Sequence, residues 1–285
     1  MSALSYLDSV ILGVVEGLTE YLPVSSTGHL TVAEKLLGYN IDDPAITSFT
    51  AIIQIGAIIA TLLYFRRPIA AMVTGFFAGL RNPARRDEPD FRLGVAVIIG
   101  SIPVVVAALL FKPLITGPLR SLWVVAAALI LWSGVIWAAE KYHDKLAARG
   151  ETKVGESEVT YMDALVIGLM QCVSVIPGVS RSGSTISGGL FRGIDRVTAT
   201  NLSFYMAIPA LVGAGVYELK DVNTAVVGWG QIGVGTAVSF VVAYASIAWL
   251  LQIVKRHGLV PFIGYRVLAG AGLLVALAAG WISAT

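Results

Sequence analysis

Two carboxylates lie four residues apart in a polar stretch of this sequence that has apolar residues on both sides. They are Glu16 and Glu20, in the segment EGLTEYLPVSSTGH that ends at His29. Side chains at this spacing share one face of a helix, so the two charges repel unless something neutralises them. A hard divalent cation takes carboxylate oxygens as ligands. Otherwise one carboxyl group keeps its proton and acts as an acid or base, or both glutamates face water at a helix end.

The same segment carries three consecutive hydroxyl groups and an imidazole. Ser25, Ser26 and Thr27 follow Pro23, and His29 lies just beyond them. A serine at such a point can cap the helix that follows, and a hydroxyl group can also act as a nucleophile. An imidazole beside serines and carboxylates can act as a general acid or base. We therefore favour a functional role for His29 over a purely structural one.

A second polar segment, PGVSRSGST at 177–185, precedes another short apolar helix. A helix start offers free N–H groups and a positive dipole to an anion, and a guanidinium group donates in a fork that matches phosphate. Arg181 supplies this group, unless it serves only in a structural ion pair with Glu16 or Glu20. The neighbouring candidates for phosphate binding are Ser180, Ser182, Gly183 and Thr185. We expect the two segments to meet in one phosphate-handling site, in which the first supplies metal ligands and a nucleophile and the second stabilises charge.

The elements that must position these residues are transmembrane helices. The chain has 285 residues, of which 56% are hydrophobic and 13% are charged, whereas soluble domains carry roughly 25% charged residues. Six apolar runs are long enough to span a bilayer as helices, near 46–65, 91–111, 120–140, 199–219, 229–253 and 262–283. The net charge of +2 argues against nucleic acid as a partner, and the single cysteine, Cys172, excludes an internal disulfide. The sequence therefore predicts an all-α integral membrane protein.

Two further apolar runs stop at a proline and are each followed by a polar turn and a short helix. The runs cover 4–24 and 161–176, and the short helices cover 28–37 and 183–192. This pattern is typical of a re-entrant helical hairpin, which a membrane protein tolerates where protein or a wet cavity covers the backbone. The sequence thus predicts six transmembrane helices and two re-entrant hairpins.

The two hairpins form an internal repeat at a shift of 155 residues. At this shift Gly13, Val24, Ser25, Gly28 and Phe49 fall on Gly168, Val179, Ser180, Gly183 and Phe204. The repeat is asymmetric, because Gln171 and Val175 stand where Glu16 and Glu20 stood. Each half holds one hairpin and three spans, an odd number, so the second half enters the membrane from the opposite side. That is an inverted-topology repeat, a build that places its site near the midplane.

We expect a single membrane domain over 1–285, with halves over about 1–140 and 161–285 and a charged linker over about 141–160. A short interfacial helix and a loop are predicted within 66–92. The basic residues expected on one side are Arg66, Arg67, Arg81, Arg85, Arg86, Arg92, Lys141, Lys145, Arg149, Lys153, Arg192, Arg196, Lys255, Arg256 and Arg266, against Lys35, Lys112, Arg120 and Lys220 on the other. Because basic residues favour the cytoplasmic side, both termini and the first hairpin are expected outside.

The two polar segments together resemble the undecaprenyl pyrophosphate phosphatase family, also called bacitracin-resistance proteins. The resemblance rests on EGLTEYLPVSSTGH and PGVSRSGST and covers essentially the whole chain. It implies hydrolysis of undecaprenyl diphosphate, a polyprenyl lipid, to undecaprenyl phosphate and inorganic phosphate. This step serves peptidoglycan synthesis, cell shape and antibiotic resistance in the bacterial inner (plasma) membrane. It also implies a divalent metal, Mg²⁺ or Ca²⁺, membrane lipids as surroundings, and a site open to the periplasmic side.

The resemblance also implies roles for particular residues. Glu16 and Glu20 match the essential glutamates of the family, Ser26 its proposed nucleophile and His29 its proposed general acid/base. Arg181 belongs to the second phosphate-binding signature, together with Ser180, Ser182 and Thr185. We expect an apolar lateral groove for the polyprenyl tail.

Several alternatives stay open at this point. Inverted repeats with broken helices are also the build of transporters, so a polyprenyl-phosphate flippase is the main rival, alone or alongside hydrolysis. A structural membrane protein would not explain the serines at both turns. The sequence leaves open whether Ser26 or a metal-bound water attacks, which glutamate binds metal, and whether the chain forms a homodimer.

Overall fold

Six long apolar helices form the body of the protein, as the sequence predicts. The computed structural model describes residues 4–115, 117–218 and 226–284. Within these ranges the chain is helical and contains no strand, apart from an isolated bridge between Lys153 and Ile194. The six helices are α3 (Pro44–Tyr64), α5 (Pro89–Leu110), α7 (Leu122–Ala148), α10 (Arg196–Glu218), α11 (Trp229–His257) and α12 (Val260–Ala278). Their length and hydropathy make this a multi-pass membrane protein.

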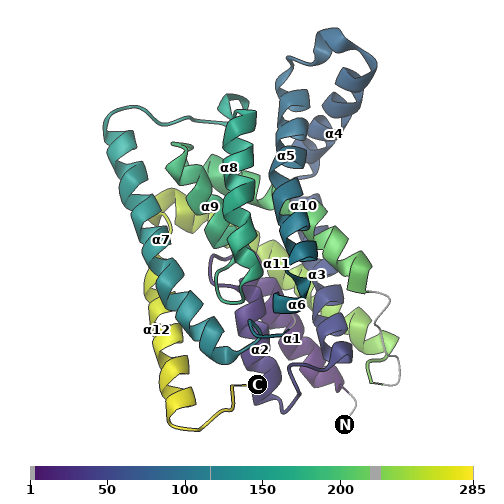
Figure 1. The fold of residues 1–285 in the computed structure, drawn as a ribbon. Coiled ribbons are helices and arrows are strands. Elements are labelled where there is room, and N and C mark those ends of the chain that lie inside the picture. Colours follow the sequence, from purple (N-terminus) through teal and green to yellow (C-terminus); the bar gives the residue numbers. More distant parts are fainter. Residues whose placement is uncertain (1–3, 116, 219–225, 285) are drawn as a thin grey trace.

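Two pairs of shorter helices lie among the long ones. The shorter elements are α1 (Tyr6–Thr19), α2 (Ser26–Leu36), α4 (Arg66–Arg81), α6 (Lys112–Ile115), α8 (Tyr161–Cys172) and α9 (Arg181–Phe191), with 3-10 turns at Pro83–Arg85, Glu156–Glu158 and Val173–Val175. The α1–α2 pair occupies the lower half of Figure 1 and the α8–α9 pair the upper half. Their connecting turns point toward one another near the middle.

The two pairs are built alike at the level of individual caps. Shifted by 155 residues, α2 (Ser26–Leu36) has the bounds of α9 (Arg181–Phe191). Ser25 and Ser180 cap these helices, by accepting from the N–H groups of Gly28 and Gly183. The two serines are also the non-glycine residues with positive φ in the described chain, at 76° and 81°. Such a φ is strained for a residue with a Cβ, so both turns adopt the same uncommon backbone.

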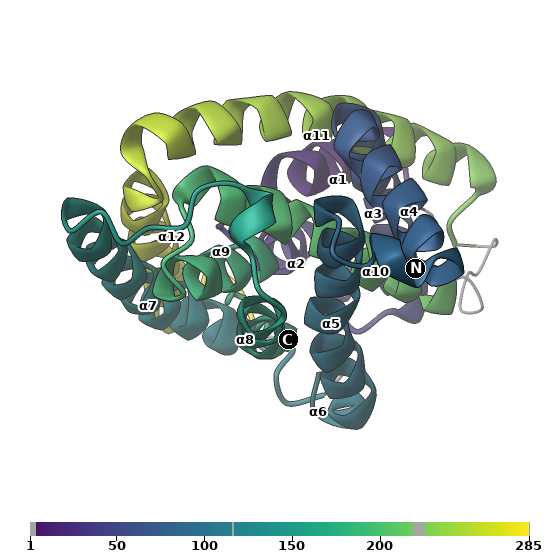
Figure 2. The same cartoon turned by 90° about the horizontal axis from the view of Figure 1, so that it is seen from above.

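Small residues allow one close crossing that holds the first pair in place. A Cβ on Gly13 would lie 2.7 Å from the carbonyl oxygen of Gly235, and one on Gly17 would lie 2.6 Å from that of Ser239. Close backbone approach at small residues is a common way for helices to pack in membranes. Helix α1 therefore lies against α11, and Figure 2 shows α11 passing beside it.

The two halves of the sequence interlock. Helix α1 of the first half packs on α11 of the second, and α8 of the second half packs on α5 of the first. An aromatic cluster crosses the same boundary, where Tyr21 meets Phe204 edge to face at 5.0 Å between ring centroids. Phe65 also packs against Phe204. Each helix pair is thus supported by a span from the other half.

Two sequence predictions change in detail. The predicted linker at 141–160 begins as helix, because α7 continues to Ala148 through residues of good helix propensity. Glu140 and Asp144, one turn apart on this extension, both accept from Arg196, which stabilises it. The short helix predicted within 66–92 is present as α4, and its interfacial position stays a prediction. Lys220, predicted on the side of few basic residues, lies outside the described ranges.

Candidate active site

The two polar turns meet directly, as the sequence predicts. The Ser25 hydroxyl oxygen accepts from the N–H of Gly178 at 3.1 Å. The Ser182 hydroxyl donates to the carbonyl of Leu22 at 3.0 Å. These bonds join residues more than 150 positions apart and satisfy backbone groups that the broken helices leave unpaired. The tips of the two helix pairs therefore form one buried polar cluster.

Glu20 occupies the centre of this cluster. Its Oε2 accepts from the Ser26 hydroxyl at 2.6 Å, and its Oε1 accepts from Arg181 Nη2 at 3.1 Å. The carboxylate is 5% exposed, so both bonds are charge-assisted and shielded from water. The ion pair considered from the sequence is therefore present, with Glu20 as the partner of Arg181. The same carboxylate also reaches the predicted nucleophile.

Arg181 is oriented by contacts on its other side. Its Nη1 donates to the carbonyl of Ser203 at 3.0 Å, and its guanidinium carbon lies 5.9 Å from the centroid of the Tyr21 ring. Thr185 is buried behind it and donates to the hydroxyl of Ser203 at 2.7 Å. Thr185 thus supports the arginine from behind.

The capping alternative holds for two of the predicted hydroxyl groups. Ser180 Oγ accepts from Gly183 N at 3.1 Å and lies 3.1 Å from Ser182 Oγ. Ser25 Oγ accepts from the amides of Gly28 and Gly178. These hydroxyl groups therefore hold the backbone of the turns. Thr27, in contrast, is exposed at the first turn of α2.

Glu16 is fully buried one helical turn before Glu20. Neither of its carboxylate oxygens has a hydrogen-bond partner in the described part of the chain, and the charges that act on it are those of Glu20 and Arg181. An unpaired buried carboxylate is costly, so this group calls for a proton or a cation. Gln171 of α8, 155 residues further along the chain, is likewise fully buried, and neither of its amide atoms has a partner among the described residues.

The protein by itself supplies only some of the ligands that a hard cation needs. Among the described residues no three His, Cys, Asp or Glu side chains gather as a complete metal site. Glu16 and Glu20 supply two carboxylates, and Glu16 has both oxygens free of other partners. Mg²⁺ commonly takes one or two carboxylates and completes its shell with water and substrate phosphates. The orphaned carboxylate therefore fits a cation that binds together with a phosphate ligand.

His29 has partners other than Ser26 on both ring nitrogens. Its Nδ1 lies 2.8 Å from the carbonyl oxygen of Ser25, and its Nε2 lies 2.6 Å from the hydroxyl of Tyr265. A carbonyl only accepts, so Nδ1 carries a proton, and the neutral ring accepts from Tyr265 through Nε2. The two rings stack at 5.6 Å between centroids. The structure thus places His29 beside α12 and pairs Ser26 with Glu20.

Arg266 also belongs to this buried cluster. The prediction from the sequence that it lies on the basic surface is therefore wrong. It is fully buried in α12 and donates to the carbonyls of Pro23 at 2.9 Å and Gly178 at 3.0 Å. Further bonds reach the carbonyl of Ala128 and the hydroxyl of Ser133. Because α12 begins at Val260, this arginine lies nearly two turns inside the helix. It joins both turns to the long helices, and none of the carboxylates that the structure describes forms an ion pair with it.

Sequence reasoning also missed Tyr265, because it belongs to neither polar segment. Its one signal is its position beside Arg266 near the start of an otherwise apolar span. A charged residue in a transmembrane segment normally faces the protein interior. That rule, applied to Arg266, could have directed attention to this part of α12.

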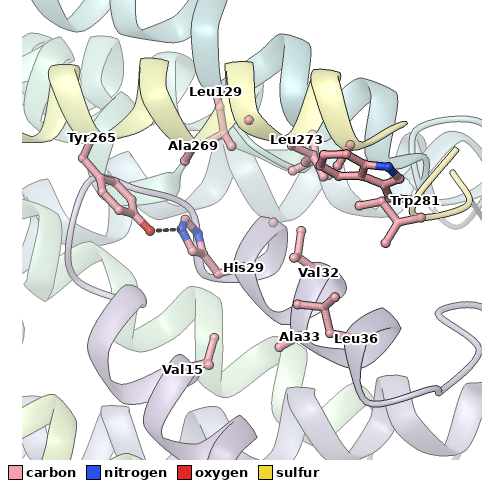
Figure 3. A pocket seen from close by; sticks show the side chains of 15 residues that line it. Val15, His29, Val32, Ala33, Leu36, Leu129, Tyr265, Ala269, Leu273 and Trp281 are labelled. Atoms are coloured by element: carbon pink, nitrogen blue, oxygen red, sulfur yellow. Dashed lines mark hydrogen bonds between the residues drawn. The ribbon is translucent and has the colours of Figure 1, made fainter. Parts of the chain in front are cut away.

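An apolar cavity of about 570 Å³ begins at His29. It is lined by residues of α1, α2, α7 and α12, including Val15, Val32, Leu129 and Leu273, and by Trp281 just after α12. Figure 3 shows the bonded His29 and Tyr265 at one end and Trp281 toward the other. One end of this apolar cavity therefore lies beside the polar cluster.

Comparison with known proteins points in one direction. Residues 9–272 match the family described as "Bacitracin resistance protein BacA". Undecaprenyl-diphosphatase 3 of Frankia casuarinae is 52% identical, over 99% of this chain and 100% of the relative. The undecaprenyl-diphosphatase of Cutibacterium acnes is 51% identical, over 94% and 95%. That of a Mycobacterium species is 45% identical, over 99% and 100%.

Proposed function

The chain belongs to the bacitracin resistance protein BacA family, and on that premise we propose how its buried cluster performs the reaction. The protein is an undecaprenyl-diphosphatase, a membrane hydrolase acting on a phosphoric anhydride. It converts undecaprenyl diphosphate to undecaprenyl phosphate and inorganic phosphate. Its roles in cell-wall precursor recycling and bacitracin resistance follow from this activity.

The observation that carries the proposed mechanism is the chain of contacts from Ser26 to Glu20 to Arg181. Ser26 Oγ attacks the terminal phosphorus while its proton passes to Glu20 Oε2. The anhydride P–O bond breaks, and undecaprenyl phosphate leaves with the bonding electrons. Water then attacks the phosphorus of the Ser26 phosphate ester, and the P–O bond to Ser26 breaks. Ser26 Oγ takes back the proton from Glu20, and inorganic phosphate is released. Direct attack by water would use the same base, so this contact serves either route.

Arg181 stabilises the charge that develops on the phosphoryl oxygens. In the structure its guanidinium group is held by Glu20 and Ser203. Protonation of Glu20 by Ser26 would weaken the ion pair and free Arg181 Nη2 for the phosphoryl group. A divalent cation, held by Glu16 and Glu20, would supply further positive charge at the diphosphate when bound.

The apolar cavity supports a position for the lipid. His29 and Tyr265 lie at one end of it, so we assign them to the phosphate that carries the prenyl chain, where a protonated Nε2 would donate to the leaving oxygen. Small-molecule sites commonly measure roughly 300–1,000 Å³. A cavity of about 570 Å³ therefore holds the first part of the long tail, and the rest extends into the bilayer.

We also propose that α1–α2 and α8–α9 are re-entrant hairpins of an inverted repeat, in a protein of the bacterial inner membrane. The shared caps, the shared positive φ and the equal bounds of α2 and α9 support the repeat. Helix α4 and the loop after it carry many of the arginines and lie at the upper end of Figure 1, away from the end where α12 stops. By the positive-inside rule, that end is cytoplasmic, and α1–α2 opens to the periplasmic side.

Lipid flipping is the second candidate function. The interlocked halves, with helix pairs at opposite ends of the molecule, favour it. A flippase moves an intact diphosphate and releases no phosphate, so product analysis separates the two activities.

The deciding experiment is phosphate release from a polyprenyl diphosphate by purified protein, with Mg²⁺, with Ca²⁺ and with a chelator. We expect metal-dependent release that falls by about 10²–10⁴-fold in Glu20→Gln, because an amide takes no proton. Glu151→Gln, at an exposed position, is the matched control and should retain full activity. If Ser26→Ala keeps the activity that Glu20→Gln loses, water is the nucleophile. Full activity in Glu20→Gln would contradict the mechanism.

A further inference from the structure

A second cavity, of about 250 Å³, lies on the other face of α2. Helix residues Thr27, Thr31 and Glu34 line it, whereas Gly28, His29 and Val32 line the apolar cavity. These two sets point to different sides of a helix with 3.6 residues per turn. Helix α2 therefore separates the two cavities, and each cavity is lined by at least one residue of its first turn.

Two residues that line this second cavity are chain neighbours of the active-site cluster. Thr27 directly follows Ser26, and Pro177 directly precedes Gly178, which bonds to Ser25. At the outer end is Arg120, whose side chain is 19% exposed, near the exposed Asp42. The cavity thus extends from residues beside the two polar turns to the segment that precedes α7.

The lining of this cavity is more polar than that of the first, although apolar side chains contribute to it as well. Its hydroxyl, amide and charged side chains are those of Thr27, Thr31, Glu34, Thr47, Thr50, Gln54 and Arg120. Hydrolysis yields one lipid product and one strongly hydrated dianion, and the two need different environments. We propose that the second cavity is the exit path of inorganic phosphate, an inference that rests on the hydrolysis proposed above.

Two opposite charges in the cavity suit passage of an anion better than retention. Arg120 is held by its Nη2, which donates to the Thr47 hydroxyl at 2.7 Å, and presents a cation near the mouth. Glu34 is 2% exposed and lines the cavity from α2. A cation focuses anions toward an opening, and a buried carboxylate repels a dianion that stays. Phosphate is therefore drawn outward and released.

This arrangement predicts opposite effects of two neutralising substitutions on product inhibition. The measurement is the inhibition constant of added inorganic phosphate in the phosphate-release assay at fixed metal concentration. Arg120→Gln should raise the inhibition constant, and Glu34→Gln should lower it, each by about three- to tenfold for a unit charge at short range. Lys112→Gln is the matched control, because it removes a cation from the same connecting segment that does not line the cavity.

The results separate this inference from the proposed function. The rate of the wild-type protein tests hydrolysis on its own, and absence of phosphate release would overturn both proposals. With normal turnover, unchanged inhibition constants in Arg120→Gln and Glu34→Gln would overturn the exit path alone. Shifts of the same sign in both, or an equal shift in Lys112→Gln, would also overturn it. Thermal unfolding of each variant in detergent verifies that the comparison is made between folded proteins.

Discussion

The carboxylates at the centre of this protein differ in their surroundings although they lie one helical turn apart. Glu20 is held by Ser26 on one oxygen and Arg181 on the other, so its charge is balanced within the protein. Glu16 is more deeply buried and has no such partner in the described residues. Breaking a buried ion pair leaves an uncompensated charge, and Glu16 is in that situation already. In the proposed mechanism their tasks therefore differ: Glu20 accepts the proton of Ser26 besides holding the cation, whereas Glu16 only holds the cation.

This difference predicts a separable effect of Glu16→Gln. Removal of an unpaired buried charge should raise the thermal unfolding temperature of the metal-free protein, because the amide is cheaper to bury. The same change should lower phosphate release and raise the Mg²⁺ concentration needed for half-maximal activity by at least about tenfold, since a ligating carboxylate is lost. Thermal unfolding with and without chelator, and activity against metal concentration, measure the two effects. A less stable variant with unchanged metal dependence would contradict the assignment.

At the scale of elements, the site depends on turns held by helices far away in sequence. The α1–α2 turn is fixed from one side by the α1–α11 crossing and from another by Arg266 of α12. The α8–α9 turn shares Arg266 through Gly178. Because the turns are not helical, their carbonyls need donors from elsewhere. The long helices thus supply both the space and the hydrogen bonds that the reactive turns require.

The α1–α11 crossing can be tested with a matched pair of glycine substitutions. Gly17→Ala places a Cβ 2.6 Å from the Ser239 carbonyl, so the helices must separate and stability should fall by about 1–3 kcal/mol. Gly134→Ala, at an exposed α7 position with open space, should instead gain about 0.5–1 kcal/mol from helix propensity. Thermal unfolding in detergent compares them. Equal stability of the two variants would show that the crossing is less tight than the structure indicates.

The buried arginine of α12 gives a second test at this scale. Arg266→Lys keeps the charge but not the planar fork that reaches carbonyls of both turns. Each buried acceptor left without a donor costs about 1–3 kcal/mol, so we expect lower unfolding temperature and lost activity. Arg256→Lys, at an exposed position on α11, should change neither quantity. Normal activity of Arg266→Lys would argue against a role in positioning the turns.

At the scale of the whole molecule, the connection between the halves is anchored by charge. Asp163, at the start of α8, accepts from Lys153 at 2.6 Å and from Arg192 at 2.7 Å. Arg196 joins the start of α10 to Glu140 and Asp144 of α7. These pairs lie where the helix pair α8–α9 begins and ends. They fix the base of α8–α9 while its tip meets the first pair.

The proposed orientation in the membrane predicts which end of the molecule each compartment reaches. In a Cys172→Ser background, Asp42→Cys should react with a membrane-impermeant maleimide in cells whose inner membrane is intact. Asp87→Cys, in the arginine-rich loop, should react only after that membrane is permeabilised. Both positions are exposed in the structure. Labelling in the reverse pattern would invert the proposed topology and place the phosphate exit on the cytoplasmic side.

Local features of the sequence were sufficient for the elements and their caps. Six apolar runs predicted six long helices, and the serines after Pro23 predicted a cap on the first short helix, which Ser25 provides. Ser180 caps the second short helix in the same way. The 155-residue correspondence also appears in the bounds of α2 and α9. Such features depend on side-chain periodicity and on hydrogen bonds within a few residues. They can therefore be predicted before any packing is known.

The partners within the site were decided by tertiary structure. The sequence grouped Ser26 with His29 because they are close in the chain, yet the fold pairs Ser26 with Glu20 and His29 with Tyr265, 236 residues away. It placed Arg266 at a surface, where the fold buries it between both turns. The two cavities also depend on the packing of distant helices. Helices α7 and α12 cover one face of α2, and α3 covers the other face. Contacts of this kind depend on how distant helices pack, which short-range spacing does not encode.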